Sequence, residues 1–253
     1  MITAGEIYEY IDSIAPFETA MSFDNVGLLV GSEETITEKV LVSLDVSSKT
    51  LQEANEIGAR IIVSHHPIIF NPLKKLLSDS VPYKAASLGI TVISAHTNLD
   101  IAECGVNNTL ADRAGVIYEN GTDSSCHLFG RFSKEYDEAE ELADDLCCAL
   151  RCKGVRFTER NGKIRSVCIA CGAGGDSIFA AAAKDVDAVI TGEIKHHELL
   201  YAMEKNIAVF DVGHYYSEAL IVDVLVKRLS EWFRNVDFIA SKTGGDGIEY
   251  YKR

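Results

Sequence analysis

Two adjacent histidines directly follow a short apolar run in this chain, and this combination limits the folds that the chain can adopt. The run Arg60-Ile61-Ile62-Val63 is typical of a buried strand, and Ser64-His65-His66-Pro67 comes immediately after it. An imidazole at the end of a buried strand is costly in free energy unless something binds it. We therefore expect an α/β sheet with a ligand site at the carboxyl ends of its strands.

Three later segments repeat this arrangement. Each follows a predicted strand and is rich in residues that bind metals: His96-Thr97-Asn98-Leu99-Asp100, Thr191-Gly192-Glu193-Ile194-Lys195-His196-His197 and Gly213-His214-Tyr215-Tyr216-Ser217-Glu218. Together with His65 and His66, these segments contain six of the seven histidines of the chain. Solvated histidines scattered over a surface would not sort in this way, so the pattern predicts a polynuclear metal site at one edge of an α/β sheet.

Apolar segments along the chain alternate between strand-like and helix-like periods, which is typical of an α/β fold. The predicted strands are 40–45, 61–64, 91–95, 127–132, 167–170, 188–191, 208–212 and 236–241. The predicted helices are 7–14, 47–57, 82–88, 106–114, 135–150, 178–184, 197–205 and 217–233. Residues 155–165 are predicted to form two strands around an Asn161-Gly162 turn.

The pattern changes after Gly115, which predicts two similar α/β lobes. The first lobe would comprise 1–125, with closing elements from the C-terminus, and the second 126–253. Ligand-type residues occur near 65–100 and again near 193–218, so the site must join the front and the back of the chain. We therefore expect the two lobes to enclose a cleft that contains a dinuclear metal site.

Composition narrows the class of protein. The chain has 253 residues, of which 47% are hydrophobic and 25% charged, as in ordinary soluble globular proteins. A net charge of −14 argues against a protein that grips nucleic acid through Lys and Arg, but not against a small anionic substrate held beside a metal. Thr3 and Glu6 have capping-box spacing, which favours a helix start over a targeting signal, and no apolar run suits a membrane span.

Two further features fit both a structural and a functional interpretation. Cys168 and Cys171 have CxxC spacing but lie in an apolar strand, which favours buried thiols over a redox or zinc pair and leaves their role open. The odd number of cysteines, seven, favours a reducing cytoplasm over disulfides. The glycine-rich turn at 172–175 suits phosphate binding, but such turns also follow strands in many folds.

The ligand-type residues suit a pair of ions. Neighbouring side chains on a strand point to opposite sides, so His65 and His66 fit two ions, one each. His214 and Glu218 are four residues apart at the start of a predicted helix, where the glutamate can bridge two ions and the histidine can bind one. Asp100 can supply an oxygen ligand. Two divalent ions, drawn from Zn, Mn, Fe, Co and Ni, are compatible with these donors.

Other residues have several possible roles. His96 suits a direct ligand, a residue that orients a ligand, or a proton carrier. Glu193 or His197 could shuttle protons, although Glu193 would equally suit a helix N-terminal cap. Asp24 and Asn25 could line the mouth of the site or form an Asx turn.

Six motifs occur in order between about Ile7 and Thr243. They are Ser22-Phe23-Asp24-Asn25-Val26-Gly27-Leu28-Leu29-Val30-Gly31, Ser43-Leu44-Asp45-Val46, Ser64-His65-His66-Pro67, His96-Thr97-Asn98-Leu99-Asp100, Thr191-Gly192-Glu193, and Gly213-His214 followed by Glu218. In this order they resemble the Ngg-interacting-factor-like family, whose members are called GTP cyclohydrolase 1 type 2 homologs. Many members have Trp where this chain has Phe23, which keeps an aromatic ring at that position.

The resemblance implies a two-lobed α/β fold, a dinuclear metal site in the cleft and a toroidal homohexamer. Carried over by position, the metal ligands would be His65, His66, Asp100, His214 and Glu218, with Glu218 bridging. The implied reaction is that of a GTP cyclohydrolase, which opens the purine imidazole ring of GTP, releases formate and yields dihydroneopterin triphosphate. The family shares its ligands more widely than its reaction.

Three functions are therefore compatible with the sequence. The first is a cytoplasmic metal-dependent hydrolase that acts on GTP. The second is a metal-dependent hydrolase of a phosphoester or of another purine compound. The third is a metal-binding, ring-shaped scaffold that contacts other proteins without turnover. The expected partners are other copies of the chain and a small anionic molecule such as a nucleotide, not a membrane or a nucleic acid.

Overall fold

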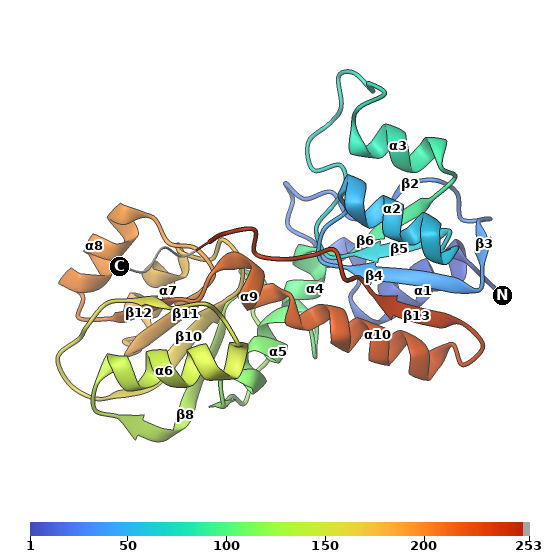
Figure 1. Ribbon diagram of the computed structural model, residues 1–253. Coiled ribbons are helices and arrows are strands. Elements are labelled where there is room, and N and C mark those ends of the chain that lie inside the picture. Colours follow the sequence, from blue (N-terminus) through green and yellow to red (C-terminus); the bar gives the residue numbers. More distant parts are fainter. Residues whose placement is uncertain (250–253) are drawn as a thin grey trace. The chain divides into compact units, whose positions relative to one another are not determined.

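The computed structural model of the chain describes residues 1–249 and confirms a mixed α/β fold (Figure 1). The chain forms two compact units. Among the described residues, the first comprises Met1–Ala102 and Ile221–Gly244, and the second comprises Glu103–Leu220 and 245–249. The predicted lobes, 1–125 and 126–253, stay a prediction.

The first unit is built on a five-stranded sheet. Five strands form this sheet: β2 (Gly27–Val30), β4 (Lys39–Ser43), β5 (Ile61–Ser64), β6 (Thr91–Ser94) and β13 (Asp237–Ala240). The unit also contains the two short strands β1 (Ile2–Thr3) and β3 (Ile36–Thr37). Its helices are α1 (Ala4–Ile14), the short 3-10 helix Phe17–Thr19, α2 (Ser48–Ile57), α3 (Val81–Ser87), α4 (Thr97–Ile101) and, from Ile221 on, α10 (Leu220–Trp232). The sheet order is β13-β4-β5-β6-β2, in which only β2 is antiparallel to its neighbour, and β1 pairs separately with β3.

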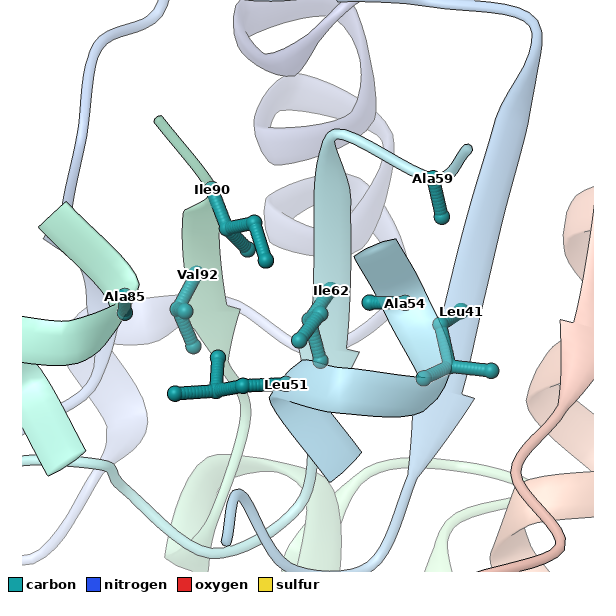
Figure 2. Close-up of a cluster of buried hydrophobic side chains, with 8 residues drawn as sticks. All are labelled: Leu41, Leu51, Ala54, Ala59, Ile62, Ala85, Ile90 and Val92. Carbon is teal, nitrogen blue, oxygen red and sulfur yellow. The ribbon is translucent and has the colours of Figure 1, made fainter. Parts of the chain in front are cut away.

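Buried side chains cover both faces of this sheet. On one face, α2 and α3 pack against β4, β5 and β6 through a cluster shown in Figure 2: Leu41, Leu51, Ala54, Ala59, Ile62, Ala85, Ile90 and Val92. Helix α1 contacts β6, and its Ile7 and Ile11 are fully buried. Burying each such Leu or Ile contributes about 1.5–3 kcal/mol, so the strands that carry the site residues are firmly held.

The second unit is built on a six-stranded sheet. Its strands are β7 (Val116–Ile117), β8 (Leu128–Tyr136), β9 (Arg156–Phe157), β10 (Ile164–Ala170), β11 (Ala188–Thr191) and β12 (Ala208–Asp211). Its helices are α5 (Val106–Arg113), α6 (Ala139–Leu150), α7 (Ser177–Ala183), α8 (His196–Glu204) and α9 (His214–Glu218). The sheet order is β7-β8-β10-β11-β12-β9, in which β10, β11 and β12 are parallel and the outer strands antiparallel. The helices α7 and α8 pack on the three central strands.

In each unit, polar segments follow the carboxyl ends of parallel strands, as expected. In the first unit, His65 follows β5 and His96 follows β6. In the second unit, Glu193 follows β11 and His214 follows β12. Parallel neighbours end at the same edge of a sheet, so each unit gathers its own set of these residues.

Several predicted elements are wrong in detail. Residues 155–165 do not form a hairpin, because β9 pairs with β12 whereas β10 pairs with β8 and β11. The helix predicted over 135–150 begins at Ala139, since β8 continues to Tyr136 in order to pair with β10. The helix predicted over 217–233 is divided into α9 and α10. Each error arises where pairing or packing with distant residues overrides local periodicity.

Local signals at the start of the chain are confirmed. Thr3 Oγ1 accepts the Glu6 backbone N–H at 3.2 Å, and Glu6 Oε2 accepts the Thr3 N–H at 2.8 Å, which completes the predicted capping box of α1.

Within residues 1–249, no helix is both long enough and apolar enough to cross a membrane. Cys168 is fully buried in β10, and this burial raises its pKa to about 12, so its thiol is a poor nucleophile.

The carboxylate of Asp187 gives the second unit a pH-dependent contribution to stability. Burial acts to raise the pKa of Asp187, but bonds from the Ser166 and Arg165 N–H groups, the Ser166 hydroxyl and the Arg160 guanidinium lower it overall. A lowered folded-state pKa stabilises the protein above the unfolded-state pKa, and this contribution is lost as pH falls through the folded-state value.

We expect Asp187→Asn to lower the free energy of unfolding by about 1 kcal/mol at pH 7, a figure reduced for partial exposure of the pair. The difference from wild type should shrink as pH falls below about 4, the ordinary range of an aspartate. Urea unfolding of both proteins at several pH values measures it. Asp144→Asn, at an exposed position, is the matched control. A gap that stays constant with pH would contradict this account.

Candidate metal centre

The first unit gathers four potential ligands, which we call the first cluster: His65, His66, His96 and Asp100. One ligand atom from each of the three histidines lies within 4.8 Å of the others. Asp100 lies on α4 and is buried, with its Oδ1 3.5 Å from His65 Nε2. Folding thus brings together the ends of β5 and β6 and the helix that follows β6.

The orientation of His65 and His66 is set from their Nδ1 atoms. His65 Nδ1 lies 2.9 Å from the carbonyl oxygen of Ala95, and His66 Nδ1 lies 2.7 Å from Asp45 Oδ1. An acceptor at Nδ1 favours the tautomer that is protonated there and leaves the lone pair of Nε2 for a metal. This is the usual outer contact of a metal-binding histidine.

Asp24 performs the same task for His96. Its side chain is fully buried, with Oδ1 2.9 Å from His96 Nδ1 and Oδ2 accepting the Thr97 N–H at 3.0 Å and the Thr97 hydroxyl at 2.6 Å. Burial acts to raise the pKa of Asp24, but the hydrogen bonds from His96 and Thr97 outweigh it and hold the pKa well below its usual range. Asp24 therefore stays ionised and anchors His96, a role that its position in a turn did not predict.

The second unit has its own set, which we call the second cluster: Glu193, His214 and Glu218. His214 and Glu218 lie on one face of α9, as the four-residue spacing predicted, with His214 Nε2 3.1 Å from Glu218 Oε2. His214 Nδ1 lies 2.7 Å from Glu193 Oε1. Glu218 is buried. The pattern of the first cluster recurs, with an oxygen at Nδ1 and a potential ligand oxygen beside Nε2.

Two glycines make room for the second cluster. Gly172 has a φ of +57°, and a β-carbon there would lie 2.1 Å from Glu218 Oε1. A β-carbon at Gly192 would lie 2.6 Å from Ser217 Oγ. The Ser217 hydroxyl accepts the Gly172 N–H at 2.9 Å and donates to the His214 carbonyl at 2.7 Å. Gly172 opens the glycine-rich turn at 172–175, which thus allows α9 to approach the sheet closely.

The predicted proton carriers have different surroundings. Glu193 is not a helix cap, because α8 begins only at His196 and the Glu193 carboxylate contacts His214. His197 lies on α8 with 70% of its side chain exposed and its Nε2 3.9 Å from Glu198 Oε1. Among the described residues of the second unit, the His197 ring pairs with Glu198 and not with the second cluster. Sequence reasoning proposed Glu193 as a proton carrier, and the structure places its carboxylate 2.7 Å from His214 Nδ1.

The donors of both clusters match the chemistry of a metal site. The three histidines of the first cluster, of which His65 is buried, lie close enough together to hold a metal ion, and in the second cluster a histidine nitrogen lies beside the buried Glu218 carboxylate. Mixed nitrogen and oxygen donors of this kind disfavour ions that require oxygen ligands alone. The ordered contacts at Nδ1 are what distinguish these histidines from solvated ones.

Comparison with known proteins identifies the family. The family model Duf34/NIF3 (NGG1p interacting factor 3) matches residues 2–245. The chain belongs to the Duf34/NIF3 family. The resemblance seen in the ordered motifs is thereby confirmed.

Relatives of this Duf34/NIF3 chain span almost its whole length. A Clostridium perfringens protein named GTP cyclohydrolase 1 type 2 homolog is 31% identical over 97% of this chain and 98% of its own. A Helicobacter pylori protein named GTP cyclohydrolase 1 type 2 is 30% identical over 88% of this chain and 90% of its own. The crystal structure of a Staphylococcus aureus hypothetical protein matches with a TM-score of 0.89 and 27% identity, covering 99% of both chains.

The affinity for metal should depend on the carboxylates that contact the Nδ1 atoms of His214 and His66. We expect Glu193→Ala and Asp45→Ala to weaken metal binding by about 10–100-fold, because His214 and His66 lose the groups that orient them. Titration of the metal-free proteins with Zn²⁺ against a chelating indicator measures the affinity. Glu193→Gln, which keeps an acceptor oxygen, should restore part of it. Unchanged affinity in both alanine variants would contradict an orienting role.

Proposed function

We propose that this Duf34/NIF3 protein is a dinuclear metal-dependent hydrolase of the GTP cyclohydrolase 1 type 2 kind. It would open the purine ring of GTP, releasing formate and leaving dihydroneopterin triphosphate. The observation that supports this most is the arrangement of the histidines. An oxygen lies at the Nδ1 atom of each one, which leaves Nε2 to bind a metal ion. The names of the relatives support the choice of substrate.

Five residues would hold the two divalent ions: His65, His66, Asp100, His214 and Glu218, with Glu218 bridging. When bound, the ions would supply Lewis acidity and a water made nucleophilic near neutral pH. Their donors come from two clusters that are each well ordered within their own unit. The proposal therefore makes the two clusters parts of one centre.

The protein residues around the ions would position groups and move protons. We propose His96 as the proton carrier, since its Nδ1 is held by ionised Asp24 and its ring lies 5.1 Å from that of His65. Glu193 contacts His214 Nδ1 and would fix that ring. His197, exposed on α8, is the weaker candidate for proton transfer.

The resemblance of the ordered motifs to this family also suggests how the chain assembles, where it acts and what it binds. We propose that the chain assembles with itself as a toroidal homohexamer in the cytoplasm and takes a small anionic nucleotide as its substrate. Light scattering of the purified protein would give the mass of the assembly, and a mass other than that of six chains would overturn this part of the proposal.

Turnover of GTP tests the reaction. The metal-reconstituted protein is incubated with GTP, and formate and pterin fluorescence are followed beside a Glu218→Ala control. Product formation that needs metal and disappears in the variant supports the proposal. If no product forms while two metal equivalents are bound, the cyclohydrolase assignment is wrong. A panel of phosphoesters and other purine compounds then tests a different hydrolase, and partner binding without turnover would favour a scaffold.

A further inference from the structure

Two exposed phenylalanines lie beside the first cluster. Phe23 is 62% exposed and Phe70 is 44% exposed, and their ring centroids are 6.3 Å apart with an interplanar angle of 56°. The Phe70 ring lies 6.1 Å from the His96 ring, at 82° to it. The His96 ring in turn lies 5.5 Å from that of His66. An apolar aromatic surface is thus continuous with the potential metal ligands.

Hydrogen bonds connect this aromatic pair to the cluster. Phe23 immediately precedes Asp24, whose buried carboxylate is fixed by His96 and Thr97. Phe70 follows Ile69, whose carbonyl accepts the Asn25 side-chain N–H at 2.6 Å. The backbone that carries each ring is therefore held near the histidines. Both phenylalanines are held in place, yet their rings remain exposed to water and add little to the core. An exposed apolar pair of this kind points to a ligand.

We propose that Phe23 and Phe70 form a subsite for the planar heteroaromatic ring of the substrate. This inference rests on the proposed function and deepens it, since it assigns residues that recognise the base. Aromatic side chains stack on any planar base because every base presents a π-face. A ring resting against Phe70 would lie beside His96 and His66, where the reacting carbon must be. The phosphates of a nucleotide would not be recognised by these rings.

A second copy of the chain is the other occupant to consider. The same loop exposes leucines at 73, 76 and 77, which extend along the sequence away from the histidines. A protein interface would use these leucines together with the phenylalanines. A ring subsite would use only the two phenylalanines that are tied to the cluster. This difference separates the two occupants experimentally.

Binding measurements with dissected probes test the subsite. The metal-reconstituted protein is titrated calorimetrically with GTP, guanosine and inorganic triphosphate. We expect Phe70→Ala and Phe23→Ala to weaken GTP and guanosine about tenfold, because base stacking on an aromatic side chain is lost, and to leave triphosphate unchanged. Phe70→Trp should retain the affinity for GTP. Leu76→Ala, an equally exposed apolar residue of the same loop, is the control and should bind like wild type.

Several outcomes would overturn the subsite. They are an unchanged affinity for GTP in both alanine variants, an equal loss of GTP and triphosphate binding, and a wild type that binds neither GTP nor guanosine. A change in assembly mass that Leu76→Ala reproduces would assign the surface to a second copy instead. Turnover is recorded in parallel, so ring-dependent binding without any formate would uphold the subsite and reject only the cyclohydrolase reaction.

Discussion

Replacing His65 by alanine should remove bound metal and reduce turnover by about 10³-fold or more, since ions of this kind are worth several kcal/mol in the transition state. His65 is fully buried, its Nδ1 is held by the Ala95 carbonyl, and its Nε2 lies 3.5 Å from Asp100 Oδ1. Inductively coupled plasma mass spectrometry of the purified variant gives the metal content per chain, and formate release gives the rate.

Two further variants separate metal loss from a folding defect. Asp100→Asn keeps the volume of the side chain and removes only its charge, so it should lose metal with little change in stability. His127→Ala is the matched control, because His127 lies in the second unit and contacts Asp123 rather than either cluster. Retention of two full metal equivalents by His65→Ala and Asp100→Asn would reject these ligands.

The metal content also tests whether the two clusters act as one centre. If Glu218 bridges two ions, Glu218→Ala should lower the affinity for both. If the clusters bind separate ions, the variant should lose one equivalent and keep the other at wild-type affinity. That second result would contradict the proposed dinuclear centre while leaving each cluster as a metal site.

Replacing Gly172 by alanine should have the second large effect. The new β-carbon would lie 2.1 Å from Glu218 Oε1, so the carboxylate must move away from His214. We expect metal affinity to fall by at least about 100-fold, comparable with loss of a metal contact. The positive φ adds a backbone cost of about 1–2 kcal/mol to the free energy of unfolding. Metal titration and urea unfolding measure the two effects separately.

Gly89→Ala is a control for the backbone cost of placing alanine at a positive φ. Its φ is +64°, close to the +57° of Gly172, and a β-carbon there would have no atom within 4 Å. Gly89→Ala should therefore show a similar loss of stability with unchanged metal binding. If Gly172→Ala binds metal as well as Gly89→Ala does, Glu218 is not held by this turn and its proposed role as a ligand is weakened.

Local patterns predicted much of the fold, but they failed where pairing is long-range. The strands β4, β5 and β6 were expected close to their observed bounds because each is an apolar run that is buried on both faces. The short edge strands β2 and β9 were missed or misassigned. Their pairing with β6 and β12 depends on distant partners, not on their own periodicity.

The same division holds for the candidate site. Local sequence was enough to predict which residues follow the strands, and the spacing of His214 and Glu218 placed them on one helical face. What holds each histidine in place could not be predicted until the chain was folded. The Nδ1 partners of His66, His65 and His96 lie 21, 30 and 72 residues away along the chain. Such contacts depend on strand order and on the closing of loops, and the space that Gly172 leaves for Glu218 depends on packing. Neither is encoded in the periodicity of a single segment.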